Sequence, residues 1–318
     1  MRLNANVGEW DFNLLDSNFR IDDLKSWGLD VDFSTLLDDS NFKTEEDELP
    51  VLEEDTKTKP GDVWLLDDHR LMCGDSTDGG SVTLLMNGKK ADMIFTDPPY
   101  NIHITNTRGK RKGISNDNIS DADFSTLLEK SFANLKSSVK DGECHVYICC
   151  NYRCYSLFEK YFLDNFTTLN NCLVWVKDAP GMGFAYRSQH EFIIFGGNFI
   201  NGCKFKDRTQ TNVWEFPSSA SFEFRNSDNF GFNNMPHPAM KPIALVAKAL
   251  GNSSKKNDLV LDLFGGSGST LIACEQTNRK CYMMELDPKF CDIIIRRWQN
   301  YTGREAIREN DSTKFNEL

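Results

Sequence analysis

The residues with the clearest chemistry form the tetrapeptide Asp97-Pro98-Pro99-Tyr100, which follows an apolar segment at 91–96. Two consecutive prolines fix the backbone and lack N–H donors, so the carbonyl groups there point in set directions. The Asp97 carboxylate and the Pro98 carbonyl can accept the two N–H groups of an exocyclic amine and stabilise the charge that develops as it attacks a methyl group. The Tyr100 ring offers a flat face for an extruded base. The tetrapeptide predicts methylation of a nucleobase amine; a proline-stiffened turn with an incidental acid is the alternative.

A second cluster lies at 258–270, where an apolar strand runs directly into Gly265, Gly266 and Gly268 before a helical pattern begins. Such a turn lets a ligand approach the backbone beside a helix N-terminus. The third glycine of a dinucleotide-binding pattern is replaced by leucine, and the Gly-Lys-Ser/Thr of triphosphate-binding loops does not occur here. The next strand ends in Glu285, placed to accept hydrogen bonds from ribose hydroxyls. The pattern favours a nucleoside cofactor without a phosphate chain, such as S-adenosyl-L-methionine.

The elements that must position both clusters alternate between strand and helix patterns after Pro60, which predicts an α/β fold with a mostly parallel sheet. The expected strands lie at 69–73, 91–96, 143–149, 171–177, 190–195, 258–263 and 280–285. The expected helices lie at 121–138, 152–163, 241–250, 269–277 and 288–300. Because open α/β sheets bind ligands at the carboxyl ends of their strands, the tetrapeptide is expected at a ligand site.

The net charge of −11 is unevenly distributed along the 318 residues. Residues 1–59 carry 16 acidic and 6 basic side chains, whereas the rest of the chain carries 31 and 30. The acidity therefore belongs to an N-terminal arm, and the near-neutral body is compatible with a polyanionic partner. Within the arm, residues 18–27 fit one amphipathic helix between Ser17 and Gly28. The arm is interpreted as a solvated linker or as a segment that docks a partner.

Two segments, 101–120 and 197–236, lack periodicity and are longer than ordinary α/β connections, which is typical of functional loops. A basic cluster in the first segment begins only eight residues after the tetrapeptide, which favours contacts with DNA phosphates over a solvated charge run. The second segment mixes basic and aromatic residues and is interpreted as a target-recognition loop or as a structural flap. The expected DNA-contacting residues are Arg108, Lys110, Arg111, Lys112, Lys204 and Arg208.

Composition excludes several other classes of protein. No apolar run approaches the roughly 18 residues of a membrane span, and the first residues lack the apolar core of a signal peptide, which indicates a cytoplasmic protein without a membrane partner. The ten cysteines form no Cys-x-x-Cys pair and the five histidines are scattered, so no metal site is expected.

Together the motifs resemble those of the amino-methyltransferases that modify DNA, specifically the permuted beta group in which the catalytic motif precedes the cofactor motif. The likeness covers residues 60–303 and is greatest for phage-type adenine methyltransferases, in which a basic loop and an Asn-Asp pair, here Asn116-Asp117, follow the DPPY. It implies a seven-stranded, Rossmann-like sheet with helices on both faces. It also implies a site-specific enzyme that transfers a methyl group from S-adenosyl-L-methionine to adenine N6 of a flipped base in double-stranded DNA.

The resemblance assigns roles residue by residue. Catalysis falls to Asp97, Pro98, Pro99 and Tyr100. The cofactor is assigned to Asp75, Asp97, His237, Lys241, Pro242, Asp262, Phe264, Gly265, Gly266, Gly268 and Glu285. Three alternatives stay open: methylation of cytosine N4, usually associated with serine in place of Asp97; an RNA substrate, associated with tryptophan in place of Tyr100; and a catalytically silent DNA-binding scaffold of the same fold.

The resemblance also bears on organisation and partners. Many relatives carry a ParB-like nuclease domain ahead of an acidic linker, whereas this sequence begins almost at the linker, so a methylase without that upstream domain is expected. Residues 304–318 are expected to form a C-terminal tail. A homodimer and a cognate restriction enzyme are compatible with the family resemblance, although no residue of the chain indicates either.

Overall fold

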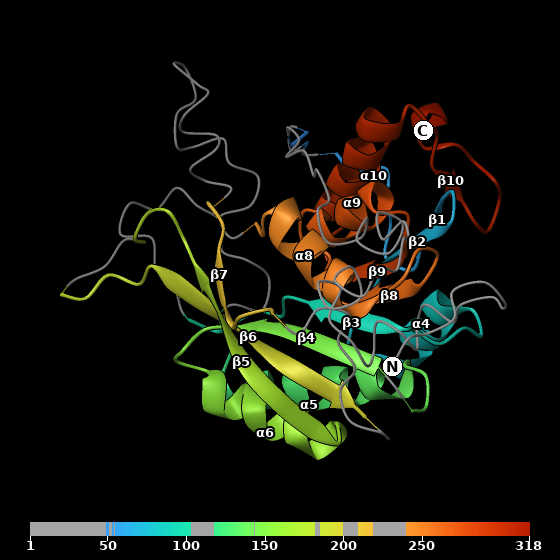
Figure 1. Cartoon of the computed structure of the whole chain (residues 1–318). Helices are drawn as coiled ribbons and strands as arrows, with labels where there is room; N and C mark the ends of the chain where they lie inside the picture. The colour runs from blue at the N-terminus through green and yellow to red at the C-terminus, as the bar shows by residue number, and fades with distance from the viewer. Residues whose placement is uncertain are drawn as a thin grey trace, which may run out of the picture.

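The computed structural model describes residues 49–50, 53, 55–102, 118–142, 144–181, 185–199, 209–218 and 240–318 (Figure 1). Its strands are β1 (Val63–Leu66), β2 (His69–Cys73), β3 (Met93–Thr96), β4 (Cys144–Cys150), β5 (Thr168–Val176), β6 (His190–Asn198), β7 (Val213–Glu215), β8 (Leu259–Asp262), β9 (Lys280–Glu285) and β10 (Ile307–Arg308). Its helices are α4 (Gly79–Met86), α5 (Asp121–Ser137), α6 (Tyr155–Asn165), α8 (Ile243–Ser253), α9 (Ser269–Gln276) and α10 (Pro288–Thr302), with a 3₁₀ turn at Phe315–Glu317.

All the described strands join one ten-stranded sheet in the order β10-β1-β2-β9-β8-β3-β4-β6-β5-β7. The seven expected strands are confirmed and are contiguous in it, from β2 to β5, and the five expected helices are confirmed as well. The expected total of seven was wrong, because β1 and β10 extend one edge and β7 the other. These additional strands have only four, two and three residues, too few to show an alternating pattern.

The sheet is mixed rather than mostly parallel, since four of its nine strand pairings are antiparallel. Only Asp67 and Asp68 connect β1 to β2, and a two-residue connection can join only antiparallel strands. Strand β6 runs antiparallel between β4 and β5, and the described residues of its connection from β5, 177–181 and 185–189, contain no helix. This reversal brings the first residues of β6 to the edge at which the parallel strands end.

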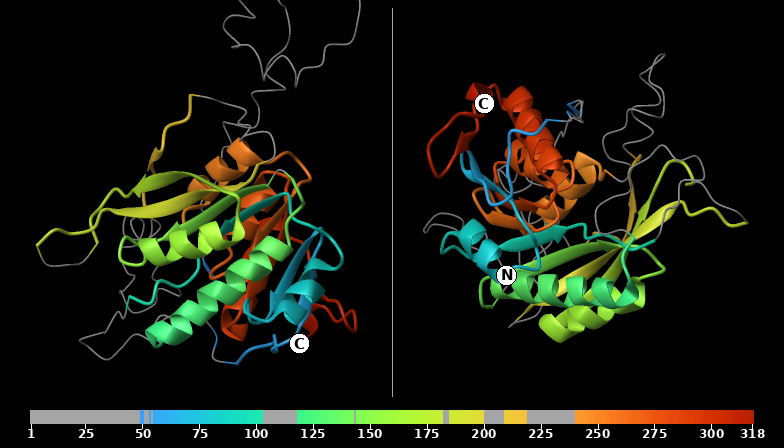
Figure 2. Two further views of the ribbon diagram at one scale, coloured as in Figure 1. Left: turned by 90° about the horizontal axis from the view of Figure 1, so that it is seen from below. Right: turned by 180° about the vertical axis from the view of Figure 1, so that it is seen from behind.

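Helices cover both faces of the sheet, as the resemblance implied (Figure 2). Alternate side chains of each central strand enter opposite cores, and in β3 Phe95 faces one core and Ile94 the other. Helices α8, α9 and α10 pack over the first core, and α4, α5 and α6 over the second. Helix α4 was not expected; Asp78 caps its first turn, but the Gly79-Gly80 pair that follows is a poor helix former.

Both ends of the described body pack against the sheet layer. The Lys57 and Thr58 amides donate to the Asp292 carboxylate of α10 at 2.8 and 3.0 Å, so residues before 60 also pack against the body. Residues 304–318 are not a free tail: β10 pairs with β1, and the Phe315 ring meets Trp64 edge-on at 5.4 Å. The burial of Phe315 explains this packing, because its apolar area is removed from water.

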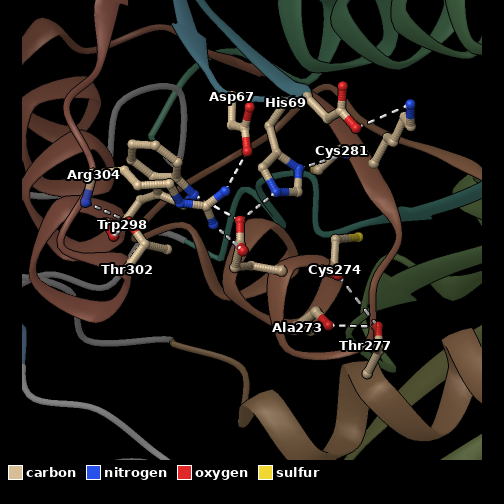
Figure 3. Close-up of polar contacts among 12 residues, drawn as sticks. Asp67, His69, Ala273, Cys274, Thr277, Cys281, Trp298, Thr302 and Arg304 are labelled. Atoms are coloured by element: carbon tan, nitrogen blue, oxygen red, sulfur yellow. Dashed lines mark hydrogen bonds and ion pairs between the residues drawn. The ribbon is translucent and has the colours of Figure 1, made fainter. Parts of the chain in front are cut away.

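A half-buried carboxylate, that of Glu275, ties this C-terminal segment to the sheet. Figure 3 shows the side chains of His69, Trp298 and Arg304 that contact it. Glu275 of α9 accepts hydrogen bonds from His69 Nε2 and Trp298 Nε1, both at 2.9 Å, and pairs with Arg304. The Cys281 amide donates to His69 Nδ1, so the ring carries its proton on Nε2. Burial alone would raise the pKa of Glu275, but these donors and Arg304 lower it to about 2. Glu275 therefore joins β2, α9 and α10.

In the part of the chain that the structure describes, no helix is both long enough and apolar enough to cross a bilayer. The acidic arm, including the helix expected at 18–27, lies outside the described residues apart from 49–50, 53 and 55–59.

Candidate active site

A cavity of 580 Å³ lies at the carboxyl edge of the sheet. Its walls come from the residues that end or directly follow β2, β3, β4, β8 and β9, together with the start of β6. Asp97, Phe264 and Glu285, which are far apart in the sequence, all line it. Open α/β sheets bind ligands at this edge, and a volume of this size is typical of small-molecule sites.

The glycine loop between β8 and α9 forms one wall of the cavity. Gly265 has no room for a side chain, because a Cβ there would stand 2.8 Å from Met283 Cγ. Gly268 caps α9 with a φ of +87°, and a Cβ on it would stand 3.0 Å from Ile294. Glycine is therefore required at both positions, for close packing and for left-handed backbone respectively.

Glu285 closes this wall with both of its carboxylate oxygens held by backbone amides. Gly266 N donates to Oε2 at 2.7 Å and Asp287 N donates to Oε1 at 2.9 Å. Burial raises the pKa of Glu285 to about 7, against the effect of these two donors. Each carboxylate oxygen can accept a further hydrogen bond, so the group can receive hydroxyls from a ligand.

Two buried charged side chains support the glycine loop from behind. Asp262 accepts from Thr96 Oγ1 at 2.7 Å and from the Phe264 amide at 3.0 Å, and burial raises its pKa to about 7. Arg297 of α10 donates to the Ser267 carbonyl at 2.9 Å. Asp262 lines the cavity, but its hydrogen bonds go to protein groups; it and Arg297 hold the loop in place.

The opposite wall is built around Asp97, which β3 delivers to the edge. Tyr100 Oη donates to Asp97 Oδ1 and Lys241 Nζ donates to Oδ2, both at 2.5 Å. The Tyr100 ring also packs edge-on against Phe158, with 6.3 Å between the ring centroids. Tyr100 therefore both fixes the Asp97 carboxylate and shapes the pocket. Burial raises the pKa of Asp97, while the Lys241 ammonium opposes the shift.

Sequence reasoning missed two charged residues of this wall, Glu191 at the start of β6 and Lys177 after β5. Glu191 forms ion pairs with Lys241, at 3.1 Å, and with Lys177. Burial alone would raise the pKa of Glu191, but the two ammonium groups outweigh it and lower the pKa to about 2. The signal available in the sequence was an acid inside the apolar run HEFIIF at 190–195. The wall therefore contains two acids and two cations, Asp97, Glu191, Lys241 and Lys177.

The structure brings most of the expected site residues together. The cavity is lined by Asp75, Asp97, Pro98, Pro99, Tyr100, Lys241, Asp262, Phe264, Gly265, Gly266 and Glu285. Pro242 and Gly268 lie behind the walls, where they begin α8 and α9. Lys241 reaches Asp97 rather than the glycine loop. The following lie outside the described residues: His237, Arg108, Lys110, Arg111, Lys112, Lys204 and Arg208.

The sheet and this cavity define an α/β methyltransferase-like fold, and comparison with known proteins identifies the family. The N6_N4_Mtase family, described as DNA methylase, matches residues 91–296. The chain therefore belongs to the N6/N4 DNA methylase family. The Type II methyltransferase M2.MboI of Moraxella bovis is 26% identical over 231 residues, which cover 66% of this chain and 81% of that protein.

Two solved structures share the fold. The M1.HpyAVI–SAM complex superposes with a TM-score of 0.53 at 23% identity, covering 71% of this chain and 97% of that one. The PvuII DNA methyltransferase, described as cytosine-N4-specific, superposes with a TM-score of 0.53 at 16% identity, covering 76% and 90%. At these identities the likeness concerns the fold alone.

Proposed function

We propose that this protein is a site-specific DNA methyltransferase that transfers a methyl group from S-adenosyl-L-methionine to adenine N6 of a flipped base. One observation carries the proposal: the Asp97 carboxylate lies in the same cavity as the glycine loop and Glu285. An acid that can receive an amine thus faces a wall suited to a nucleoside cofactor. Family membership supports methylation of an exocyclic amine in DNA, and aspartate at position 97 favours adenine over cytosine.

The cofactor wall fits S-adenosyl-L-methionine on its own chemistry. Glu285 offers carboxylate oxygens suited to ribose hydroxyls, and the glycine loop exposes bare backbone to the cavity at Gly265 and Gly266. The loop contains no lysine for a phosphate chain. Asp75, beside the cavity, is assigned to the adenine end. When bound, S-adenosyl-L-methionine supplies a methyl group activated by a positively charged sulfur.

The target wall would bind and activate the amine. Asp97 and the Pro98 carbonyl accept the two N–H groups, which draws the nitrogen lone pair out of the ring and toward the methyl group. Tyr100 and Lys241 fix the Asp97 carboxylate through its two oxygens. After transfer the amine must lose a proton, and Asp97 is the adjacent carboxylate able to accept it.

The finer assignments belong to this proposal. Motif order along the chain, with Asp97 before the glycine loop, supports a permuted methyltransferase whose domain spans residues 60–303. The contiguous strands from β2 to β5 support a seven-stranded core with added edge strands. The loops at 101–120 and 197–236 are proposed to contact DNA through Arg108, Lys110, Arg111, Lys112, Lys204 and Arg208. A cytoplasmic location, a homodimer and a cognate restriction enzyme belong to the same proposal.

The test is transfer of labelled methyl from S-adenosyl-L-methionine to duplex DNA, followed by nucleoside analysis of the product. We expect N6-methyladenine at a defined sequence. Detection of N4-methylcytosine would show that cytosine N4, and not adenine N6, is the target. Labelling of RNA in preference to DNA would show that RNA is the substrate. Tight DNA binding without any turnover would indicate a catalytically silent scaffold instead.

A further inference from the structure

The cavity has two halves: the cofactor half, formed by the glycine loop with Glu285 and Asp262, and the target half, formed around Asp97, Tyr100, Lys241, Glu191 and Lys177. Each half exposes one large apolar side chain. Among its described lining residues, Leu286 follows Glu285 in the cofactor half and is 41% exposed, and Tyr152 follows β4 in the target half and is 52% exposed. A large apolar surface that faces solvent inside a functional cavity is best explained by a ligand that covers it. Leu286 lies where the cofactor is expected, whereas nothing assigned so far covers Tyr152.

The local backbone presents Tyr152 rigidly. Asn151 directly follows β4, and its side-chain oxygen accepts from the Arg153 amide at 3.1 Å. Its carbonyl accepts from the Cys154 amide at 3.1 Å, and the buried Cys154 begins α6. This turn fixes the backbone on both sides of Tyr152, so the ring is held at the cavity without being buried.

Arg153 lies beside the ring, and it forms no ion pair with any acid that the structure describes. Its Nε donates to Tyr152 Oη at 3.1 Å, and its guanidinium lies 5.7 Å from the ring centroid. The other two cations of the cavity lining, Lys177 and Lys241, each pair with a carboxylate. Among the residues that the structure describes, Arg153 has no such partner. An exposed cation without an acid, beside an exposed aromatic ring, is suited to an anionic ligand with a flat group.

We propose that Tyr152 and Arg153 form a binding site for the DNA strand that carries the target base. Tyr152 stacks on a base next to the methylation pocket, and Arg153 binds a backbone phosphate. Proteins that hold unpaired nucleic acid combine these two contacts, an aromatic platform and a cation on the backbone. The inference rests on the proposed function, because it takes the ligand of the target half to be DNA. It adds a contact outside the loops at 101–120 and 197–236.

The experiment measures the Kd for a fluorescent duplex containing the target site, at several salt concentrations with S-adenosylhomocysteine present. For Arg153→Gln we expect the slope of log Kd against log salt to fall by about one. For Tyr152→Ala we expect a loss of affinity of about 5- to 150-fold, and for Tyr152→Phe near-normal affinity, since the ring is kept. The matched control is Lys160→Gln on α6, an exposed cation that pairs with Asp164 and is not part of the cavity lining.

Two further measurements separate this site from the rest of the enzyme. Thermal unfolding and the Kd for S-adenosyl-L-methionine should equal those of the wild-type protein in all four variants. Unchanged DNA affinity and salt slope in both Tyr152→Ala and Arg153→Gln would overturn the inference. Weakened cofactor binding in Arg153→Gln would overturn it as well, by assigning Arg153 to the cofactor carboxylate. Failure of the proposed function can be distinguished from failure of this inference, because the wild-type protein itself would then methylate no DNA.

Discussion

The two halves of the cavity hold their acids in opposite ways. In the cofactor half, Glu285 and Asp262 receive hydrogen bonds from amides and hydroxyls, and burial raises the pKa of each to about 7. In the target half, Glu191 lies against two ammonium groups, which lower its pKa to about 2. Asp97 pairs with the ammonium of Lys241 alone, and burial still raises its pKa. Neutral donors thus leave Glu285 and Asp262 near neutral pH, whereas two paired cations keep Glu191 ionised. The cofactor half should therefore respond to pH and the target half to the loss of a charge.

The largest expected effect is that of Asp97→Ala. Loss of a group that stabilises developing charge typically lowers kcat by about 100-fold or more. The Asp97 carboxylate contacts Tyr100 and Lys241 of the target half, so the Kd for S-adenosyl-L-methionine should change little, in contrast to the cofactor contact that the resemblance also assigned to Asp97. Single-turnover methylation at saturating DNA, together with calorimetric titration of the cofactor, checks both statements. Near-normal methylation by this variant would remove Asp97 from the mechanism.

Glu191→Gln should have the next largest effect, and it tests the charge pairing of the target half. The substitution leaves the buried Lys241 with Asp97 as its only acid partner among the described residues, and it removes the partner of Lys177. Breaking a buried ion pair costs about 3–5 kcal/mol of unfolding free energy. Methylation should also slow, because Lys241 is then held by one acid instead of two and positions the Asp97 carboxylate less firmly.

Chemical denaturation measures this loss, and Asp164→Asn is the matched control. It breaks a solvent-exposed pair with Lys160, which water and salt screen, so the loss of unfolding free energy should be much smaller. Equal losses in the two variants would contradict the view that the target half depends on buried charge. Cofactor affinity should be unaffected in both, which keeps the distinction between the halves testable.

In the cofactor half we expect pH dependence. If the ionised Glu285 carboxylate receives ribose hydroxyls, affinity for S-adenosyl-L-methionine should rise with pH up to about 7, the pKa of Glu285, and then level off. Below that pH it should change about tenfold per pH unit. Titration calorimetry between pH 5 and 9 measures the profile. Glu285→Gln should bind weakly with a flat profile, and a flat profile in the wild-type protein would refute the assignment.

The same pKa shift has a consequence for the stability of the cofactor-free protein. The folded protein holds its proton on Glu285 up to pH about 7, whereas the unfolded chain releases it near 4.5. Between those values the folded state binds more protons, so unfolding free energy falls as pH rises through this window. Glu285→Gln should remove part of that fall, and Asp262, shifted in the same direction, should retain the rest.

The sequence predicted the cofactor half more completely than the target half, for a physical reason. The main groups of the cofactor half, the glycine loop and Glu285, follow consecutive apolar strands, and parallel strands bring their carboxyl ends to one edge of the sheet. Glu191 comes from the amino end of β6, and it reaches this edge only because β6 runs antiparallel between β4 and β5. Local periodicity contains no information about that reversal. Lys241 was predicted, but its contact with Asp97 depends on how α8 packs against β3.

The smallest expected effect, that of Arg297→Lys, tests whether the cofactor half depends on hydrogen-bond geometry rather than on charge. The Arg297 guanidinium is buried behind the glycine loop and donates to the Ser267 carbonyl at 2.9 Å. Lysine keeps the charge but loses the planar fork of donors. Because one hydrogen bond contributes about 1 kcal/mol, affinity for S-adenosyl-L-methionine should fall about fivefold. DNA affinity should not change. A fall in DNA affinity equal to that in cofactor affinity would show that the loop and the target half move as one unit, and the distinction between the halves would then fail.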